Sequence, residues 1–280
     1  MQLRSLLFLP ATRLERLGKA LASGADMVVL DLEDGVGPED KPAARQALDD
    51  LARLDMKAHE GRIAVRINSL ATADGIRDLA MMLDWQAWPA MLVVPKVEAA
   101  AEVRQVAALA STGASAPALL LTLETAAGIL AAEDIAAAAP SGSVLGYGSA
   151  DHMGETGGTM TPTSLAFGRG QVLNAAAKRQ LSAVDGVWLD FRDTKGLTAE
   201  AELAKSMGFT GKIAIHPDQI APIHRVFTPT PEEVEDAKAL LGAVASAGKG
   251  AFAFNGRMVD APVLARARKI VEAAERDNEV

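Results

Sequence analysis

The feature that most constrains the fold is a regular alternation of short apolar segments with alanine- and leucine-rich stretches. Continuous apolarity is typical of strands buried on both faces, and helical stretches between them are the connections that parallel strands require. Eight such units predict a closed TIM-type (β/α)8 barrel of the α/β class, with an open doubly wound sheet as the structural alternative. The segments begin near Ser5, Asp26, Arg62, Met91, Ala118, Ser143, Gly186 and Lys212.

A length of 280 residues suits one barrel, and no long linker divides the chain. We predict that residues 1–228 form the barrel and that residues 229–280 form a C-terminal helical extension used as a lid or for oligomerisation. In that extension Thr230 is the expected N-cap of one helix, and a last helix is expected from about Ala261. The Gly- and Thr-rich stretch Gly154–Ser164 is expected to be a loop that can move.

Composition and missing motifs exclude several classes of function. The net charge of −8 makes nucleic-acid binding unfavourable, and the absence of cysteine excludes disulfides, thiolate zinc sites and a cysteine nucleophile. The apolar stretch Leu6–Leu9 is too short for a signal peptide, and no run approaches the roughly 18 apolar residues of a membrane helix. No GxGxxG, Walker A, HExxH or GxSxG motif is present. We therefore expect a cytoplasmic protein with no membrane or nucleic-acid partner.

Polar residues follow nearly every apolar segment, and reactive residues of barrel enzymes lie at the carboxyl ends of the strands. Several carboxylates with few histidines favour oxygen ligation, which suits Mg²⁺ or Mn²⁺ better than zinc. Any one of these residues could instead be a solvated loop residue, and Asp151 could be a helix N-cap. The residues are Asp31, Glu33, Asp34, Arg66, Asn68, Lys96, Glu98, Glu124, Asp151, His152, Asp190 and His216.

Eight motifs occur in order along nearly the whole chain. They are RSLLFLP at Arg4–Pro10, DLEDGV at Asp31–Val36 with Lys41 and Arg45 following, VRIN at Val65–Asn68, VPKVE at Val94–Glu98, LETAAGI at Leu123–Ile129, GFTGKIAIHPDQI at Gly208–Ile220, FTPTPEEV at Phe227–Val234 and GRMVDAP at Gly256–Pro262. In these motifs the chain resembles the citrate lyase β-subunit-like (HpcH/HpaI aldolase/citrate lyase) family. The similarity is to its malyl-CoA and citramalyl-CoA lyases and related thioesterases.

The resemblance implies a metal site at the barrel rim. Glu124 and Asp151 would be the Mg²⁺ ligands, with Mn²⁺ as a substitute, and Glu33 and Asp34 would hold metal-bound waters. Glu124 would also contact substrate. Arg66 would be a catalytic and substrate-binding residue that clamps the carboxylate of a small 2-oxo acid such as glyoxylate, pyruvate or oxaloacetate. On the residues alone, a protein carboxylate could equally be the partner of Arg66.

The resemblance also implies a binding surface for the thioester. Phe8, Arg13 and Lys19 match positions that hold coenzyme A, although Phe8 could be a core residue and Lys19 an ordinary surface lysine. Ile215 and His216 lie in the matching acyl-binding segment. His152, directly after the aspartate of the metal site, departs from the Leu, Tyr or Phe of many relatives, which leaves the acyl specificity open.

The resemblance places the catalytic carboxylate, Asp260, on the C-terminal lid. The lid of this family reaches over a neighbouring subunit, which implies a homo-oligomer, a homotrimer or a hexamer; without the motif, Asp260 would read as a cap of the last helix. The implied activity is that of a Mg²⁺-dependent acyl-CoA lyase, with Asp260 moving a proton at the acyl methyl carbon. The alternatives are a citryl-ACP lyase subunit, a β-hydroxyacyl-CoA thioesterase and a non-catalytic regulatory protein that binds metal and 2-oxo acid.

Overall fold

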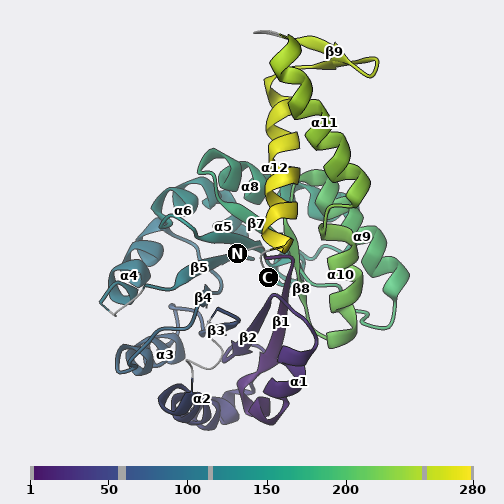
Figure 1. Ribbon diagram of the computed structural model, residues 1–280. Helices are drawn as coiled ribbons and strands as arrows, with labels where there is room; N and C mark the ends of the chain where they lie inside the picture. The colour runs from purple at the N-terminus through teal and green to yellow at the C-terminus, as the bar shows by residue number, and fades with distance from the viewer. Residues whose placement is uncertain (1–2, 56–60, 113–115, 248–250, 279–280) are drawn as a thin grey trace. The chain divides into compact units, whose positions relative to one another are not determined.

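The computed structural model describes residues 3–55, 61–112, 116–247 and 251–278. Within them, parallel strands β1 to β8 form a closed barrel in chain order, with β8 hydrogen-bonded back to β1 (Figure 1). The predicted TIM-type barrel is therefore confirmed. The strands are β1 (Ser5–Pro10), β2 (Met27–Asp31), β3 (Ile63–Arg66), β4 (Met91–Val94), β5 (Ala118–Leu123), β6 (Val144–Tyr147), β7 (Ser182–Asp185) and β8 (Gly211–Ala214).

Helices connect successive strands and cover the outside of the barrel (Figure 1). None of the helices formed by the described residues combines the length and apolarity that a membrane-spanning segment needs. The helices up to Phe227 are η1 (Ala11–Arg16), α1 (Leu17–Ala22), η2 (Pro38–Asp40), α2 (Lys41–Asp55), α3 (Ala73–Leu83), α4 (Ala100–Ala110), α5 (Ala126–Leu130), α6 (Ala132–Ala138), α7 (Ser149–Thr156), α8 (Pro162–Lys178), α9 (Thr194–Met207), η4 (Pro217–Gln219) and α10 (Ile220–Phe227).

The chain forms two compact units, Leu3–His224 and Arg225–Val280. The second unit contains α11 (Pro231–Ala247), a hairpin of β9 (Phe252–Phe254) and β10 (Arg257–Val259), and α12 (Ala261–Asn278). The Thr230 hydroxyl accepts the Glu233 N–H (3.1 Å), and the Glu233 carboxylate accepts the Thr230 N–H (2.9 Å). This reciprocal capping confirms the predicted helix start at Thr230.

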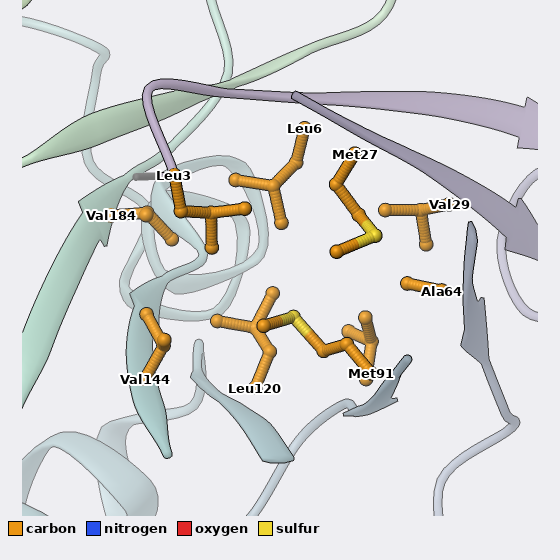
Figure 2. Packing of buried hydrophobic residues seen from close by; sticks show 10 residues of the cluster. Leu3, Leu6, Met27, Val29, Ala64, Met91, Leu120, Val144 and Val184 are labelled. Carbon is orange, nitrogen blue, oxygen red and sulfur yellow. The ribbon is translucent and has the colours of Figure 1, made fainter. Parts of the chain in front are cut away.

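The barrel interior is filled by apolar side chains that point toward one another from successive strands (Figure 2). Because side chains alternate between the two faces of a strand, every second residue belongs to this core. The buried core residues are Leu3, Leu6, Met27, Val29, Ala64, Met91, Val93, Leu120, Val144 and Val184.

The seventh strand begins earlier than predicted. The prediction of a strand from Gly186 was wrong: β7 is Ser182–Asp185, and the apolar segment that starts at Gly186 is the loop after it. Asp190, expected at the strand end, lies in this loop. Leu189 and Phe191 in the same loop are 57% and 40% exposed, so the apolar sequence there does not reflect burial.

The polar sequence of β7 reflects a buried ion network behind the barrel wall. Asp185 accepts hydrogen bonds from Arg169 of α8 (2.9 and 2.8 Å) and Lys212 of β8 (2.6 Å), and Glu200 of α9 contacts both cations. These cations hold the pKa of the Asp185 carboxyl below its usual value despite burial, which works in the opposite direction. A charged residue can thus end a buried strand because two other elements, α8 and β8, supply its cationic partners.

The expected loop Gly154–Ser164 is shorter than predicted. Helix α7 includes Gly154 and ends where Gly157 adopts the left-handed conformation (φ +72°). Thr161 then caps α8 by accepting the Ser164 N–H (3.3 Å), so the Thr- and Pro-rich half of the stretch starts a helix.

Candidate active site

The carboxyl ends of the strands carry a group of polar side chains around the mouth of the barrel. The core residues of each strand point inward, so residues two or four positions later on the same face point to the mouth. The side chains at such positions are Phe8, Asp31, Arg66 and Glu124.

Asp31 and Arg66 form the base of the site. They are register partners at the ends of β2 and β3, and Asp31 accepts two hydrogen bonds from Arg66, from Nε (2.6 Å) and from Nη2 (2.7 Å). Burial lowers the pKa of Arg66, but the hydrogen bonds and charge of Asp31, with the charges of Glu33 and Glu124, more than offset it and raise the pKa above normal. The guanidinium also lies over the Phe8 ring (4.8 Å). The partner of Arg66 in this structure is therefore a protein carboxylate.

A second set of hydrogen bonds holds the backbone of the loop after β2. Lys41 Nζ donates to the carbonyls of Leu32 (3.0 Å) and Glu33 (2.9 Å) and to Asn68 Oδ1 (2.6 Å). Asn68 in turn donates to Asp78 (2.7 Å). These contacts explain why Lys41 and Asn68 belong to the motifs around the site: they fix the backbone that presents Glu33 to the mouth.

Glu33 and Asp34 extend the negative charge of the rim. Glu33 is almost fully buried, and its Oε2 lies 2.9 Å from Arg66 Nη1. Burial raises the pKa of Glu33, although the charges of Arg66 and Lys96 oppose the shift. Asp34 is exposed, with its carboxylate 3.2 Å from Lys96 Nζ.

Glu124 is buried just beyond the end of β5. Its Oε1 accepts the backbone N–H of Lys96 (2.8 Å). Burial, together with the charges of Glu33 and Asp151, raises the pKa of Glu124 to about 8. On the other side, a Cβ added to Gly148 would lie 2.2 Å from the Glu124 Cβ and 2.3 Å from Oε2, so only glycine leaves room for this carboxylate.

Asp151 reaches the site from the first turn of α7, and its side chain is 39% exposed. Its Oδ1 lies 3.7 Å from Lys96 Nζ. Glu155, one turn later in α7, accepts the Ala126 N–H (2.6 Å) and so ties this helix to the segment that follows Glu124.

The donor set fits a divalent cation with oxygen ligands. Magnesium takes one or two protein carboxylates and fills its remaining positions with water and substrate. Among the described residues, no group of three or more carboxylate, histidine or cysteine side chains is arranged to hold a metal ion without further ligands. The pair Glu124 and Asp151, from two separate elements, suits such a partly hydrated ion. Burial first, and then the charges of Glu33 and Asp151, raise the pKa of Glu124, and a bound cation would offset both effects.

The predicted thioester-binding residues lie outside this acidic group. Arg13 and Lys19 are exposed on η1 and α1, which directly follow β1, and Arg13 pairs with Glu15 (3.8 Å). Phe8 joins the acidic group only through its contact with Arg66. All three roles in binding coenzyme A remain predictions.

The segment after β8 presents Ile215 and His216. Ile215 is 40% exposed, and its N–H is held by Gln219 Oε1 (2.8 Å). The His216 ring stacks on Phe191 of the loop after β7 (4.7 Å between centroids), a contact between residues far apart in the sequence.

His152 points away from the acidic group. Its Nδ1 is hydrogen-bonded to the Tyr147 hydroxyl (2.9 Å), and both side chains are buried. Burial lowers the pKa of His152, which favours the neutral ring. His152 thus packs behind Asp151.

Asp260 belongs to the second unit, between β10 and α12. Its Oδ1 accepts the Val263 N–H over a long 3.4 Å, in the manner of a helix cap. Its catalytic role at the barrel mouth therefore stays a prediction.

The sequence did not assign a role to Asp31 or Lys96, the two charged residues that contact the acidic group most directly, nor to the supporting residues Lys41, Asn68 and Glu155. Asp31 reads as the end of a strand, but it is the anchor of Arg66. Lys96 reads as one polar residue of VPKVE, but its ammonium also contacts Glu33 (2.6 Å). The signal in the sequence was their position, because Asp31 is the last residue of β2 and Lys96 lies two residues after β4.

The fold and the site together define a (β/α)8-barrel enzyme with an acidic centre at the carboxyl ends of its strands. A family model described as HpcH/HpaI aldolase/citrate lyase matches residues 4–217. A second model, described as a C–C bond lyase of the TIM-barrel fold, matches residues 168–277. The chain belongs to the HpcH/HpaI aldolase/citrate lyase family, as its motifs indicated.

Curated relatives and a solved structure agree with this assignment. The chain is 38% identical over 277 residues to the citrate lyase subunit beta-like protein of Deinococcus radiodurans, with 96% of each protein covered. It is 37% identical over 277 residues to a (3S)-malyl-CoA thioesterase of Cereibacter sphaeroides, covering 97% of this chain and 94% of the relative. It is also similar to the crystal structure of CitE from Mycobacterium tuberculosis in complex with magnesium, acetoacetate and coenzyme A, with a TM-score of 0.80, 37% identity and coverage of 97% and 98%.

The space around Glu124 can be tested with a pair of glycine substitutions. Gly148→Ala places a methyl group against the Glu124 side chain, so we expect a stability loss of roughly 1–3 kcal/mol and at least about tenfold weaker Mg²⁺ binding. Gly154→Ala in α7 meets no atom within 4 Å and should leave binding unchanged, with stability equal or higher by up to about 1 kcal/mol. Urea unfolding and calorimetry measure both; equal Mg²⁺ binding in the two variants would contradict the packing argument.

The raised pKa of Glu124 predicts how the metal-free protein responds to pH. Between about pH 4.5 and 8 the folded state keeps a proton on Glu124 that the unfolded chain has lost, so stability falls as pH rises through this window. The slope should approach about 1 kcal/mol per pH unit and should flatten in Glu124→Gln. Unfolding of chelator-treated protein at stepped pH measures it, and identical slopes in the two proteins would refute the prediction.

Proposed function

We propose that the protein is a Mg²⁺-dependent carbon–carbon lyase that acts on an acyl-CoA thioester. It would cleave or form the bond between the enolate carbon of the thioester and a small 2-oxo acid, namely glyoxylate, pyruvate or oxaloacetate. The observation that carries the proposal is the buried Glu124, held beside Asp151 and the Arg66–Asp31 pair at the barrel mouth. The relative crystallised with magnesium, acetoacetate and coenzyme A supports the same combination of ligands.

Glu124 and Asp151 would hold the metal, and Glu33 and Asp34 would accept hydrogen bonds from its waters. Mn²⁺ would suit the same oxygen ligands. When bound, the ion would supply Lewis-acid polarisation of the oxo group. Gly148 keeps the space in which the Glu124 carboxylate lies.

Arg66 would orient the 2-oxo acid. A guanidinium has five N–H donors, and Asp31 takes two of them. Arg66 Nη1 also lies 2.9 Å from Glu33 Oε2, so a substrate carboxylate would meet the donors that these two carboxylates leave free. The Asp31 pair and the Phe8 ring limit how far the group can turn. Holding the 2-oxo acid in one orientation would align its oxo carbon with the enolate carbon of the thioester.

Asp260 would move the proton at the methyl carbon of the acyl group. The side chain stands at the start of α12, where its position is set by the end of the β9–β10 hairpin. The enolate that forms is the charge that the site must stabilise, and exclusion of water protects it. Arg13 and Lys19, both exposed after β1, would pair with the phosphates of coenzyme A, and Ile215 and His216 would contact the acyl part.

A thioesterase is the second candidate, favoured by the 37% identity to a (3S)-malyl-CoA thioesterase. The two activities share the binding surface and differ in whether water reaches the thioester carbonyl. Product analysis separates them, because hydrolysis releases the intact acid, whereas the lyase releases an acyl-CoA and a 2-oxo acid.

The proposal is tested by assaying the Mg²⁺-loaded protein with malyl-CoA, citramalyl-CoA, hydroxymethylglutaryl-CoA and citryl thioesters beside Asp260→Asn. Asparagine keeps an oxygen that can cap α12 but cannot take up a proton, so kcat should fall about 10²–10⁴-fold with stability unchanged. Asp236→Asn, exposed on α11 of the same unit, is the matched control and should behave as the parent protein. Absence of cleavage with every thioester, or full activity of Asp260→Asn, would overturn the mechanism.

We further propose that Asp260 serves a neighbouring subunit in a homotrimer or hexamer. Asp260→Asn and Glu124→Ala chains would each be inactive alone. Mixed oligomers would contain sites with an intact Glu124 from one chain and an intact Asp260 from the other, so co-expression at equal levels should restore about a quarter of the parental activity per site. Light scattering gives the subunit number, and mixed oligomers without activity would contradict the shared site.

A further inference from the structure

Lys96 contacts every carboxylate proposed to surround the metal. Its backbone N–H donates to Glu124 Oε1 (2.8 Å), and its ammonium lies 2.6 Å from Glu33, 3.2 Å from Asp34 and 3.7 Å from Asp151. Lys96, which follows β4, therefore contacts carboxylates from the segments that follow β2, β5 and β6.

The backbone at Lys96 shows that this position is imposed by the surroundings. Its φ is +50°, in the left-handed region that non-glycine residues enter only at a cost of about 1 kcal/mol or more. The hydrogen bond to Glu124 holds the backbone, and the ion pairs with Glu33 and Asp34 hold the side chain. Because backbone strain of this kind is concentrated at functional sites, we expect Lys96 to have a function beyond packing at the proposed metal site.

The charges at the mouth explain what the ammonium does. Among the described residues, the group comprises five carboxylates and two cations, of which Arg66 is already paired with Asp31. The second cation is Lys96. Without Lys96, Glu33 would keep its ion pair with Arg66 (2.9 Å), whereas Asp34 and Asp151 would lose their ion pairs with the ammonium and repel one another and Glu33. The residues of the group are Asp31, Glu33, Asp34, Glu124, Asp151, Arg66 and Lys96.

We propose that Lys96 is an internal counter-cation that stabilises the metal-free site and yields Asp151 to the divalent ion when it binds. The inference rests on the proposed metal site and adds a residue that sets its affinity. The contact with Asp151 is the longest of the three ion pairs, at 3.7 Å against 3.2 Å for Asp34 and 2.6 Å for Glu33, so it is released at least cost. The contact with the buried Glu33 is short, so the ammonium stays anchored there.

This role makes a prediction that a purely structural lysine would not. A structural lysine supports the ligands, so removing it lowers both stability and metal affinity. A counter-cation competes with the metal, so removing it lowers the stability of the metal-free protein and raises the affinity for Mg²⁺. For a counter-cation, the stability of the metal-free protein and the affinity for Mg²⁺ therefore change in opposite directions when the ammonium is removed.

The test uses Lys96→Met, which keeps the aliphatic stem and removes the charge. Lys96→Arg keeps the charge, and Lys178→Met removes a surface lysine whose partner is Glu133. Melting temperature is measured after chelator treatment and at saturating Mg²⁺, and Mg²⁺ binding is measured by calorimetry with the metal salt alone. None of these readouts depends on turnover.

We expect Lys96→Met to melt a few degrees lower without metal, to bind Mg²⁺ roughly tenfold more tightly and to gain more in melting temperature from Mg²⁺. Lys96→Arg and Lys178→Met should bind Mg²⁺ as the parent protein does. Unchanged or weaker binding in Lys96→Met, with normal binding by the parent, would overturn the counter-cation and leave the metal site intact. If neither protein bound Mg²⁺, the proposed metal site would fail and the inference with it.

Discussion

Repulsion among carboxylates gathered in a partly buried mouth is the constraint on which the rest of this site depends. Glu33 and Asp34 follow β2, Glu124 follows β5 and Asp151 lies in α7, and these segments would separate if nothing opposed their like charges. Burial makes the problem more severe, as the raised pKa of Glu124 shows. The barrel opposes this repulsion with two cations, Arg66 at the end of β3 and Lys96 after β4, which lie between the carboxylates of β2 and those after β5 and β6 in the strand order.

The supports of the site are as specific as its charged groups. Arg66 and Asp31 meet because they are register partners on neighbouring strands, where parallel pairing places both side chains on the inner face. Gly148 leaves the volume that Glu124 fills, and Lys41 ties down the backbone that carries Glu33. A substitution at one of these supports would therefore disturb the chemistry without touching a reacting atom.

The two parts of the molecule divide the proposed reaction between them. In the proposed reaction the barrel unit would supply the metal ligands, the arginine and the surface for the thioester, and the second unit of a neighbouring subunit would supply Asp260, which precedes α12. An acid or base carried on a separate unit can be withdrawn from the enolate carbon between steps, which suits a reaction whose intermediate must be kept from water. The proposed lyase and the thioesterase would differ in how well this separation excludes water.

The sequence by itself determined the barrel, seven of its eight strand positions, the capped helix at Thr230 and the carboxylates that end the strands, because apolar periodicity and cap residues are local signals. Only the tertiary structure decided the position of β7, since Asp185 looks unsuited to a buried strand until Lys212 supplies its partner. It alone also decided that Arg66 is anchored by Asp31 and that Lys96 joins four carboxylates. Such contacts depend on strand register and loop geometry, which bring together residues far apart in the chain.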